Sequence, residues 1–526
     1  MVCWLPLASA PSTLSGCRSS ATKHGAEVNR LDALTSWHAD WSSLRVAVYG
    51  LGITGFAAAD TLAELGADVL VVTGVAPDAR ARLLGAIGVR LVQGELDEAP
   101  AELVTHKPEL IIVSPGFYPG HALLRWASDQ GIPVWGDIEL AWRLRDKVGT
   151  PAQWIVVTGT NGKTTTVQLT ASMLAAAGHR VAPCGNIGIP VVDAIRDPTG
   201  WDVLVVELSS FQLHHLSRTG PGALVPWASV CLNVADDHID WHGSAAAYRD
   251  AKSTVYSNTT VACVYNKADP ATLQMVQDAD VEEGARAIGF GLGVPGPSEF
   301  GVVDGILCDR AFLEERFEKA IELTTVRKLA AAGLGAPHIV ANVLAASALA
   351  RSFGVAPGVI RTVLGTFRLD AHRVEVIAAT KDIRWVDDSK ATNPHAADAS
   401  LKAFGSVIWI VGGLLKGVDI DELVARHVER LRGAIIIGVD RAALREAFRR
   451  HAPILRVFEI DADDTKQVML NAVRLAAGLA EAGDVVLLAP AAASMDQFSD
   501  YAERGRLFAE AVREYLGGEA DDESAS

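Results

Sequence analysis

The residues with the clearest chemistry form one stretch, Gly159-Thr160-Asn161-Gly162-Lys163-Thr164-Thr165. The apolar run Trp154–Val157 before it predicts a buried parallel strand, and a helical pattern follows from Val167 to Ala177. Glycines at a strand-to-helix turn let backbone N–H groups close around an anion, and the helix N-terminus adds a partial positive charge. A loop of this kind is suited to binding phosphate.

Within this loop, Lys163 can reach the outer phosphates of a nucleotide, and the hydroxyl of Thr164 can ligate Mg²⁺. The spacing differs from that of the common phosphate loop, because Val157 occupies the position of its first glycine. A turn that only packs a strand against a helix is the alternative. The intact Gly-Lys-Thr-Thr run favours an ATP site.

Polar groups also stand where three neighbouring apolar segments end. Glu207 closes the run Val203–Val206, His238 follows a predicted strand that includes Leu232, and Asn186 lies in a loop after a short strand. Ligands bind outside the carboxyl ends of strands in open α/β sheets, and a carboxylate beside a phosphate loop can contact Mg²⁺. A single histidine such as His238 is more often a plain loop residue than a ligand-binding one. The three strand ends taken together favour a functional site.

Two later segments are less informative when read alone. Lys252 ends the polar helical stretch Tyr248–Lys252 and reads there as a solvated helix lysine. The segment Ala341–Ala346 opens an alanine-rich amphipathic helix, in which Asn342 is a candidate adenosine contact.

The N-terminal part of the chain has a Rossmann-like beginning. A strand from Leu44 to Tyr49 leads into the turn Gly50-Leu51-Gly52-Ile53-Thr54-Gly55, then a helix and a second strand. A dinucleotide site would need an acidic residue at the end of that second strand, but Thr73 stands there. A pyrophosphate site is favoured, and a turn used only for packing is the alternative.

The C-terminal part repeats the strand–loop–helix spacing without a phosphate loop of its own. Its predicted strands lead into loops rich in polar groups, among them 387–394, 412–416 and 489–498. Such spacing predicts a doubly wound α/β domain whose polar loops gather at one sheet edge.

The chain is therefore predicted to be an α/β protein of three domains. These are a Rossmann-like domain (29–149), a central domain with a phosphate-loop ATPase-like, mostly parallel sheet (150–366), and a doubly wound Rossmann-like domain (367–517). Residues 1–28 and the acidic tail 518–526 are expected to be disordered extensions. The sequence around Leu14-Ser15-Gly16-Cys17 is like a lipoprotein cleavage box, but no Lys or Arg precedes it.

Composition excludes several classes of function. The 526 residues carry a formal net charge of −16, which argues against a nucleic acid or an anionic membrane as partner. The six cysteines are scattered without a CxxC pair, so neither a zinc site nor a disulfide framework is indicated. Apolar runs are too short to span a membrane, and a cytoplasmic monomer that acts on small molecules is expected.

The Gly-Thr-Asn-Gly-Lys-Thr loop resembles that of the Mur ligase and folylpolyglutamate synthetase superfamily. The run Asp388-Ser389-Lys390-Ala391-Thr392-Asn393 and the run Ser494-Met495-Asp496-Gln497-Phe498, with Tyr501 and Arg504-Gly505 behind it, are similar to the D-glutamate-adding branch of the Mur ligases. The resemblance extends from about Leu31 to Gly517. It implies ATP-dependent amide bond formation between UDP-N-acetylmuramoyl-L-alanine and D-glutamate, through an acyl phosphate.

The resemblance also implies roles for individual residues. ATP would be held by Gly159, Thr160, Asn161, Gly162, Lys163, Thr164, Thr165, Asn342, Arg373 and Asp388. The UDP-sugar would be held by Ile53, Thr54, Gly94, Ser114 and Asn186. D-glutamate would be held by Lys390, Thr392, Lys416, Ser494, Met495 and Tyr501. Two Mg²⁺ ions would be bound, one by Thr164 and Glu207 and one by His238 and a CO₂-carbamylated Lys252. Catalysis would then depend on Lys163, Glu207, His238 and Lys252, with His238 bridging metal and substrate rather than acting as a base.

The sequence departs from the family pattern at two positions. Thr73 stands where an acidic uridine contact is frequent, and Ile339 stands where an asparagine is common after His338. Three other interpretations stay open at this point. One is a folylpolyglutamate synthetase-like ligase, but the first-domain glycine turn counts against it. Another is an NAD-dependent oxidoreductase, which would leave the ATP loop unexplained. The last is an inactive UDP-sugar-binding regulator, which would not need Lys163, Glu207 and His238.

Overall fold

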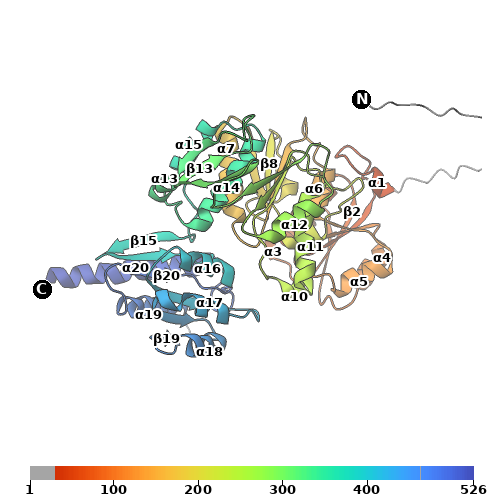
Figure 1. Ribbon diagram of the computed structural model, residues 1–526. Coiled ribbons are helices and arrows are strands. Elements are labelled where there is room, and N and C mark those ends of the chain that lie inside the picture. Colours follow the sequence, from red (N-terminus) through yellow and green to blue (C-terminus); the bar gives the residue numbers. More distant parts are fainter. Residues whose placement is uncertain (1–29, 462–463, 526) are drawn as a thin grey trace, which may run out of the picture.

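A computed structural model describes residues 30–461 and 464–525, with the side chains of 518–525 left aside. Three parallel or mostly parallel sheets, each flanked by helices, divide the chain in sequence order (Figure 1). The predicted α/β fold class is thereby confirmed. The predicted extension at 1–28 lies outside the described residues, as do Cys3 and Cys17.

The first sheet has the strand order β3-β2-β1-β4-β5, and all its pairs are parallel. Its strands are β1 (Arg45–Tyr49), β2 (Asp68–Thr73), β3 (Arg90–Gln93), β4 (Leu110–Val113) and β5 (Val134–Gly136). Its helices are α1 (Arg30–Ala33), α2 (Ile53–Glu64), α3 (Asp78–Ala86), α4 (Ala101–His106), α5 (Ala122–Asp129) and α6 (Asp137–Arg143). The strands are almost wholly apolar because helices cover both faces of a parallel sheet.

The second sheet has nine strands in the order β14-β13-β12-β11-β10-β9-β6-β8-β7. Those strands are β6 (Gln153–Thr158), β7 (Val181–Gly185), β8 (Val203–Glu207), β9 (Ala228–Cys231), β10 (Ala262–Asn266), β11 (Arg286–Phe290), β12 (Glu299–Val303), β13 (Ile306–Asp309) and β14 (Ile321–Thr325). The helices are α7 (Lys163–Ala176), α8 (Val191–Ala194), α9 (Ser210–His214), α10 (Ile239–His242), α11 (Ala245–Ser253), η1 (Thr254–Tyr256), α12 (Pro270–Asp278), α13 (Val326–Ala331), α14 (Pro337–Ser352) and α15 (Pro357–Thr366). Only the β12–β13 and β13–β14 pairs are antiparallel.

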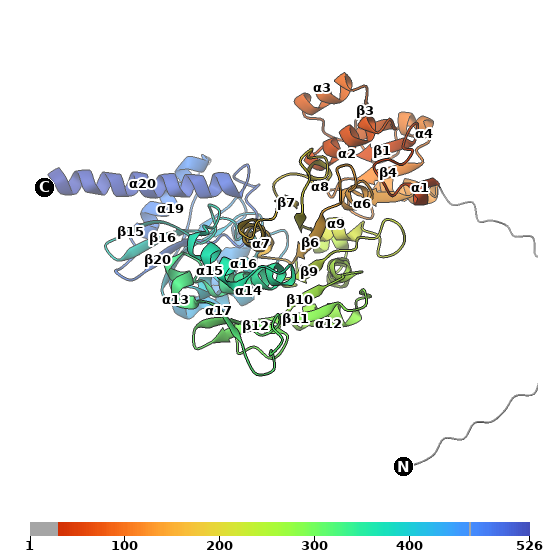
Figure 2. The ribbon, with the colours of Figure 1, turned by 90° about the horizontal axis from the view of Figure 1, so that it is seen from above.

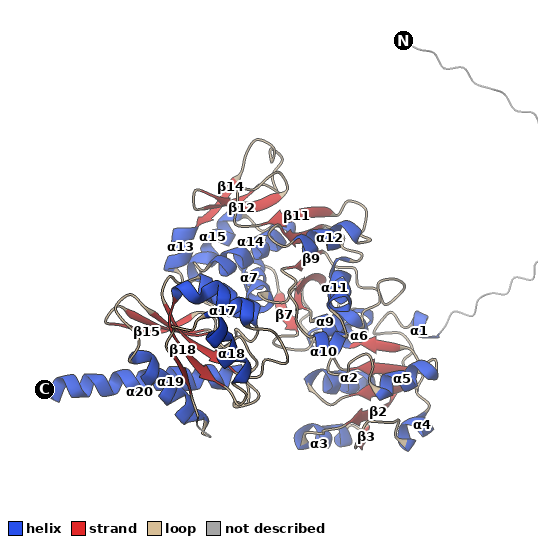
Figure 3. Cartoon of the chain, turned by 60° about the horizontal axis from the view of Figure 1, so that its bottom comes forward, coloured by secondary structure: helices blue, strands red, loops and turns tan. Residues whose placement is uncertain are grey.

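The third sheet has the order β15-β16-β20-β17-β18-β19, with one antiparallel pair between β15 and β16. Its strands are β15 (Glu375–Thr380), β16 (Ile383–Asp387), β17 (Val407–Gly412), β18 (Leu431–Ile437), β19 (Val457–Glu459) and β20 (Val485–Leu488). Its helices are α16 (Pro394–Lys402), α17 (Asp421–His427), η2 (Val428–Arg430), α18 (Ala442–His451), α19 (Thr465–Ala477) and α20 (Tyr501–Ala525). Figure 3 shows helices on both sides of this sheet.

Packing joins the first two domains more closely than the third. One hydrophobic cluster runs from Leu31 in the first domain to Met275 in the second. Helices α2 and α6 pack on α8, and Arg196 pairs with Asp60 and Glu64. The third sheet has its own apolar clusters on its two faces, and in Figure 1 this blue domain stands apart from the rest. The third domain thus has a hydrophobic core that is separate from that of the first two.

Several segment boundaries differ from the sequence-based prediction. Helix α7 begins at Lys163 rather than Val167, and α14 begins at Pro337 rather than near Ala341. The polar run Lys163–Thr166 obscures the apolar period in the first turn of α7. Strand β9 ends at Cys231, so Leu232 already lies in the loop beyond it. Helix α20 extends through Ala525, into the segment 518–526 whose acidic composition predicts disorder.

Candidate active site

The phosphate-type loop joins β6 to α7 at the centre of the second sheet. Strand β6 pairs with β8 on one side and β9 on the other, so the loops after all three strands meet at one edge. Gly159 and Gly162 have φ values of +148° and +86°, which side chains rarely adopt. A Cβ on Gly162 would stand 2.5 Å from Oδ1 of Asn342. The loop therefore depends on both glycines, and Asn342 in α14 lies directly against it.

The loop is held from the β9 side by Asn233. Its Oδ1 accepts from the backbone N–H of Asn161 at 2.8 Å, and its Nδ2 donates to the carbonyl of Asn161 at 3.1 Å. The hydroxyl of Thr160 meets the hydroxyl of Tyr248 at 2.9 Å. Asn233 and Tyr248 were not singled out from the sequence, because an asparagine after a strand and a tyrosine in a polar helix carry no distinctive spacing.

Lys163 is folded back over its own loop. Its Nζ donates to the carbonyls of Gly159 at 2.9 Å and Thr160 at 3.0 Å. Burial lowers the pKa of this ammonium, while Glu207 and Asp237 act in the opposite direction. The ammonium thus already lies where the loop would receive phosphate.

Glu207 ends β8 with a side chain that is only 2% exposed. One oxygen accepts from the hydroxyl of Thr164 at 2.9 Å, and the other accepts from Nδ2 of Asn186 at 3.0 Å. A hydroxyl and a carboxylate in contact at the start of a helix are a donor set that suits Mg²⁺. Asn186 belongs here to the Glu207 group, in the second domain, and not to the first-domain turn where the other predicted UDP-sugar residues lie.

Lys252 is not the solvated lysine that its helix suggests. It is 2% exposed, with Nζ 3.4 Å from Oγ1 of Thr158 and 4.8 Å from the centre of the Tyr248 ring. Within the described part of the chain it forms no ion pair, and burial followed by Lys163 lowers its pKa to about 7. Local periodicity could not show this, because α11 is buried by its packing on α9 and η1. The neutral amine that this environment favours is the form that reacts with CO₂, so the site fits a carbamate.

His238 also lies near Tyr248, with the two ring centres 6.4 Å apart. Its backbone has φ of +52°, and its Nε2 is 3.6 Å from Oδ2 of Asp237. Burial lowers the pKa of the imidazole, which favours the neutral form that binds metals. The structure thus gathers His238 and Lys252 around one tyrosine beside the phosphate-type loop.

The third domain reaches this region through the segment after β16. Asp388 is buried, accepts from the hydroxyl of Ser400 and from the backbone N–H of Val374, and has its pKa raised to about 6 by burial. Lys390 lies with Nζ 3.7 Å from the centre of the Tyr501 ring. Arg373 contributes to the electrostatics of both Lys163 and Asp388.

Arg504 bonds to residues that lie next to the predicted D-glutamate residues in the chain. Fully buried in α20, it donates to the hydroxyl of Ser389 at 3.0 Å, to the carbonyl of Ser389 at 2.9 Å and to that of Ala492 at 3.2 Å. Ser494 follows as a buried residue, whereas Met495 is 64% exposed. Lys416 lies in the loop after β17 with φ of +54°. The backbone N–H of Thr392 donates to the carbonyl of Lys390 at 2.8 Å. The loops that carry Lys390, Lys416 and Ser494 follow the neighbouring strands β16, β17 and β20 of one sheet.

The first-domain turn closes around Ser114. A Cβ on Gly55 would stand 2.1 Å from the carbonyl oxygen of Gly50, so the turn needs glycine there. The buried hydroxyl of Ser114, at the end of β4, has no hydrogen-bond partner among the described residues. Ile53 is 61% exposed at the first turn of α2, beside Thr54. Gly94 follows β3 and donates to the carbonyl of Thr73 at 3.2 Å.

The two departures from the family pattern have structural counterparts. Thr73 is buried, and its hydroxyl donates to the carbonyl of Val75 at 2.8 Å. Ile339 is part of the hydrophobic core of the second domain. Neither side chain can therefore make the polar contact that the family's usual residue would make at its position.

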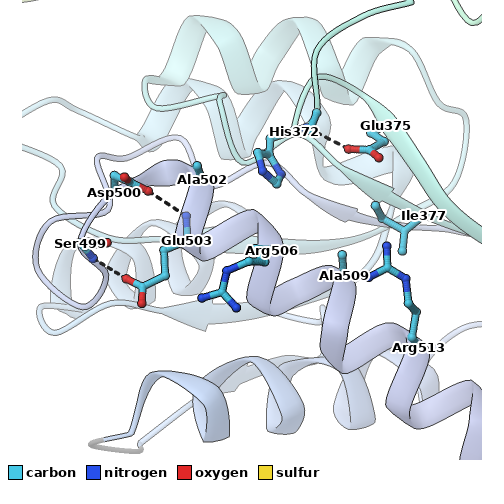
Figure 4. A pocket seen from close by; sticks show the side chains of 11 residues that line it. His372, Glu375, Ile377, Ser499, Asp500, Ala502, Glu503, Arg506, Ala509 and Arg513 are labelled. Carbon is cyan, nitrogen blue, oxygen red and sulfur yellow. Dashed lines mark hydrogen bonds between the residues drawn. The ribbon is translucent and has the colours of Figure 1, made fainter.

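A separate cavity of about 510 Å³ lies in the third domain between β15 and α20 (Figure 4). It is lined by residues that include His372, Glu375, Glu503, Arg506 and Arg513. His372, Glu375 and Asp387 are close enough to share a metal ion, but they are already paired. Nδ1 of His372 lies 2.6 Å from Asp387, and Glu375 accepts from the backbone N–H of His372 at 3.0 Å. We interpret this group as an ion-pair cluster that fixes the start of β15.

Comparison with known proteins gives the same order of three domains. Residues 44–136 match the family model described as Mur ligase MurD-like, N-terminal domain. Residues 157–350 match the Mur ligase middle domain, and residues 372–492 match the Mur ligase, glutamate ligase domain.

Full-length relatives are also similar. A UDP-N-acetylmuramoylalanine–D-glutamate ligase of Leifsonia xyli is 67% identical over 95% of this chain and 98% of its own length. The protein of the same name from Streptomyces avermitilis is 51% identical over 90% and 99%. Among solved structures, the MurF ligase from Thermotoga maritima in complex with ADP is 18% identical, with a TM-score of 0.52 and coverage of 86% and 96%. That likeness concerns the fold.

Proposed function

This chain belongs to the Mur ligase family, and from that premise we infer that it joins D-glutamate to UDP-N-acetylmuramoyl-L-alanine. ATP is converted to ADP and phosphate in the reaction, which serves peptidoglycan precursor synthesis. The observation that carries the assignment is the 67% identity to a D-glutamate ligase over 95% of the chain. An enzyme that uses ATP and a UDP-linked substrate is expected to work in the cytoplasm, as a monomer.

The proposed first step forms an acyl phosphate. An oxygen of the terminal L-alanine carboxylate attacks the γ-phosphorus of ATP, and the bond to the β,γ-bridging oxygen breaks to release ADP. We assign the phosphate groups to the loop 159–165 and its Lys163, whose ammonium already lies over the loop carbonyls. Asn342, Arg373 and Asp388 are assigned to the rest of the nucleotide. Phosphoryl transfer depends mainly on positioning and charge stabilisation, which these groups supply.

The second step forms the amide bond. The amine of D-glutamate attacks the acyl carbon, a tetrahedral intermediate forms, and phosphate leaves as the nitrogen loses its proton. We assign D-glutamate to Lys390, Thr392, Lys416, Ser494, Met495 and Tyr501 in the third domain. Buried Arg504 acts through Ser389 and Ala492 to fix these loops, so it is a positioning residue.

We assign the UDP-sugar to the first-domain turn. The support is the close approach of Gly55 to Gly50 and the unpartnered hydroxyl of Ser114 beside it. Ile53, Thr54 and Gly94 belong to the same set, and Asn186 would contact the sugar from the second domain. With Thr73 satisfied by Val75, the uracil contact must come from other residues.

Thr164 with Glu207 would hold one Mg²⁺, and His238 with a carbamylated Lys252 would hold a second. These ions would supply charge neutralisation for the phosphates. The carbamate forms when the neutral Lys252 amine attacks the carbon of CO₂ and loses a proton, which leaves an anionic N–COO⁻ group. Burial without an ion pair favours the neutral amine that this reaction needs.

Product analysis with a panel of amines tests the function. The protein is incubated with ATP, Mg²⁺ and UDP-N-acetylmuramoyl-L-alanine, together with D-glutamate, L-glutamate, L-lysine or no amino acid. We expect phosphate release and a product one glutamyl residue heavier only with D-glutamate. Equal release with L-glutamate, or none with any amine, would overturn the assignment. A folate substrate serves as the control for the related synthetases.

A further inference from the structure

The third domain touches the phosphate-type loop through one pair of amide side chains. Nδ2 of Asn161 donates to Oδ1 of Asn393 at 3.3 Å, and Nδ2 of Asn393 donates to Oδ1 of Asn161 at 3.1 Å. The same Nδ2 of Asn393 lies 3.5 Å from Oδ2 of Asp237, the residue before His238. A reciprocal amide pair satisfies a donor and an acceptor on each side, so it fixes both separation and orientation.

Both partners are fixed to their own elements. Asn161 is held by Asn233, which bonds its backbone N–H and carbonyl. Asn393 is the N-cap of α16, where its Oδ1 also accepts from the backbone N–H of Ala396 at 2.9 Å. Because both side chains are held in place, the amide pair joins the loop after β6 to the first turn of α16.

A second residue of the second domain lies near the same helix. His338, at the start of α14, is close to the backbone of Ala399 in α16, and burial lowers the pKa of its imidazole to about 4. Figure 2 looks onto the second and third domains from above, so α16 overlaps α7 and α14 in that view. The N-terminal end of α16, which carries Asn393, meets the phosphate-type loop.

Asn393 adjoins the proposed D-glutamate residues in the chain. Thr392 is the residue before it, and Lys390 stands three residues before it. Because Asn393 is held by both Asn161 and α16, the proposed D-glutamate loop is set at a fixed distance from the proposed ATP loop. The amine can attack the acyl carbon only if that distance is correct.

We propose that Asn393 is a positioning residue that couples the ATP loop to the D-glutamate loop through Asn161. The proposal rests on the proposed function, because it assigns the two loops to successive steps of one reaction. It requires that loss of the pair impairs the second step, attack by D-glutamate, while nucleotide binding to the second domain is retained.

The test variant is Asn393→Ser, because serine keeps the N-cap of α16 but is too short to reach Asn161. We expect kcat/KM for D-glutamate to fall about tenfold, the scale of one or two net hydrogen bonds. The affinity for ADP and the ADP formed without an amino acid should stay within about twofold, since neither requires the third-domain contact. Asp464→Ser, a cap exchange at the exposed start of α19, is the matched control and should behave as wild type.

A double-mutant cycle separates coupling from local damage. At saturating ATP, Asn161→Ala, Asn393→Ser and the double variant should lose similar kcat/KM for D-glutamate, because each breaks the same pair. Asn393→Asp provides a second variant of equal size that keeps the cap but cannot donate, and it should also be impaired. Independent, multiplicative losses, or wild-type kcat/KM in Asn393→Ser and Asn393→Asp, would overturn the proposal. Wild-type protein without D-glutamate-dependent turnover would instead refute the proposed function.

Discussion

At the scale of single residues, sequence and structure agree best where chemistry imposes strict spacing. Lys163 and Thr164 follow from a short loop whose geometry is local, and the structure puts both at the first turn of α7. Lys252 is the opposite case. Its helix is polar in sequence, and only the packing of α11 onto α9 and η1 buries the amine. Burial by distant elements leaves no local pattern, so the sequence could suggest a role for Lys252 only through resemblance.

Replacing Lys252 tests the proposed carbamate. We expect Lys252→Ala to lower kcat by at least about 100-fold, the scale on which removal of a charge-stabilising group acts. Acetate should partly restore turnover, because its carboxylate can occupy the space that the side chain leaves. The measurement is kcat at increasing acetate concentration.

Arg249→Ala is the control for that experiment. Arg249 stands on the same helix but is exposed, so its loss should leave kcat unchanged and acetate should have no effect. Wild-type turnover in Lys252→Ala would rule out the carbamate.

At the scale of secondary-structure elements, the sequence predicted most strands well because parallel strands buried on both faces are short apolar runs. The start of α7, which lies in a polar first turn, could not be read from apolar periodicity. The contact between α16 and the phosphate-type loop was also beyond prediction, since it joins Asn161 and Asn393 across 232 positions of the chain.

The glycine turn between β1 and α2 offers a test of element packing. Gly55→Ala should lower the melting temperature, because a Cβ there stands 2.1 Å from the carbonyl oxygen of Gly50. Overpacking of this kind costs about 1–3 kcal/mol. Gly52→Ala is the matched control, since its Cβ meets nothing within 4 Å and its φ is negative. Equal melting temperatures for the two variants would contradict the described turn.

The ion pair between His372 and Asp387 predicts how stability changes with pH. The hydrogen bond to Asp387 raises the pKa of His372 above its ordinary value, although burial opposes it. Because the pKa of His372 is higher in the folded than in the unfolded chain, its protonation stabilises the fold. This stabilisation is fully present below the unfolded-state pKa of about 6.5 and is lost as the pH rises through the folded-state pKa. The melting-temperature advantage of wild type over His372→Gln should therefore shrink as the pH rises above about 6.5. Exposed His395→Gln is the control, and an advantage that grows with pH would contradict the ion pair.

At the scale of the whole molecule, the proposed function divides the substrates among the three domains. The first and second domains share a hydrophobic cluster, whereas the third has its own and meets the second through polar contacts that include Asn393 and Gln168. Such an interface can open to admit substrates and close to bring the amine to the acyl carbon. Within the described residues, no helix combines the length and apolar character of a membrane span.

The most direct test of the account follows an oxygen atom. UDP-N-acetylmuramoyl-L-alanine is labelled with ¹⁸O in its terminal carboxylate and converted with ATP and D-glutamate, and the released phosphate is analysed by mass spectrometry. If the carboxylate attacks the γ-phosphorus and phosphate later leaves from the acyl carbon, each phosphate carries one ¹⁸O from the substrate. Phosphate without the label, released while the amide product accumulates, would contradict the acyl-phosphate route and the roles assigned to the three domains.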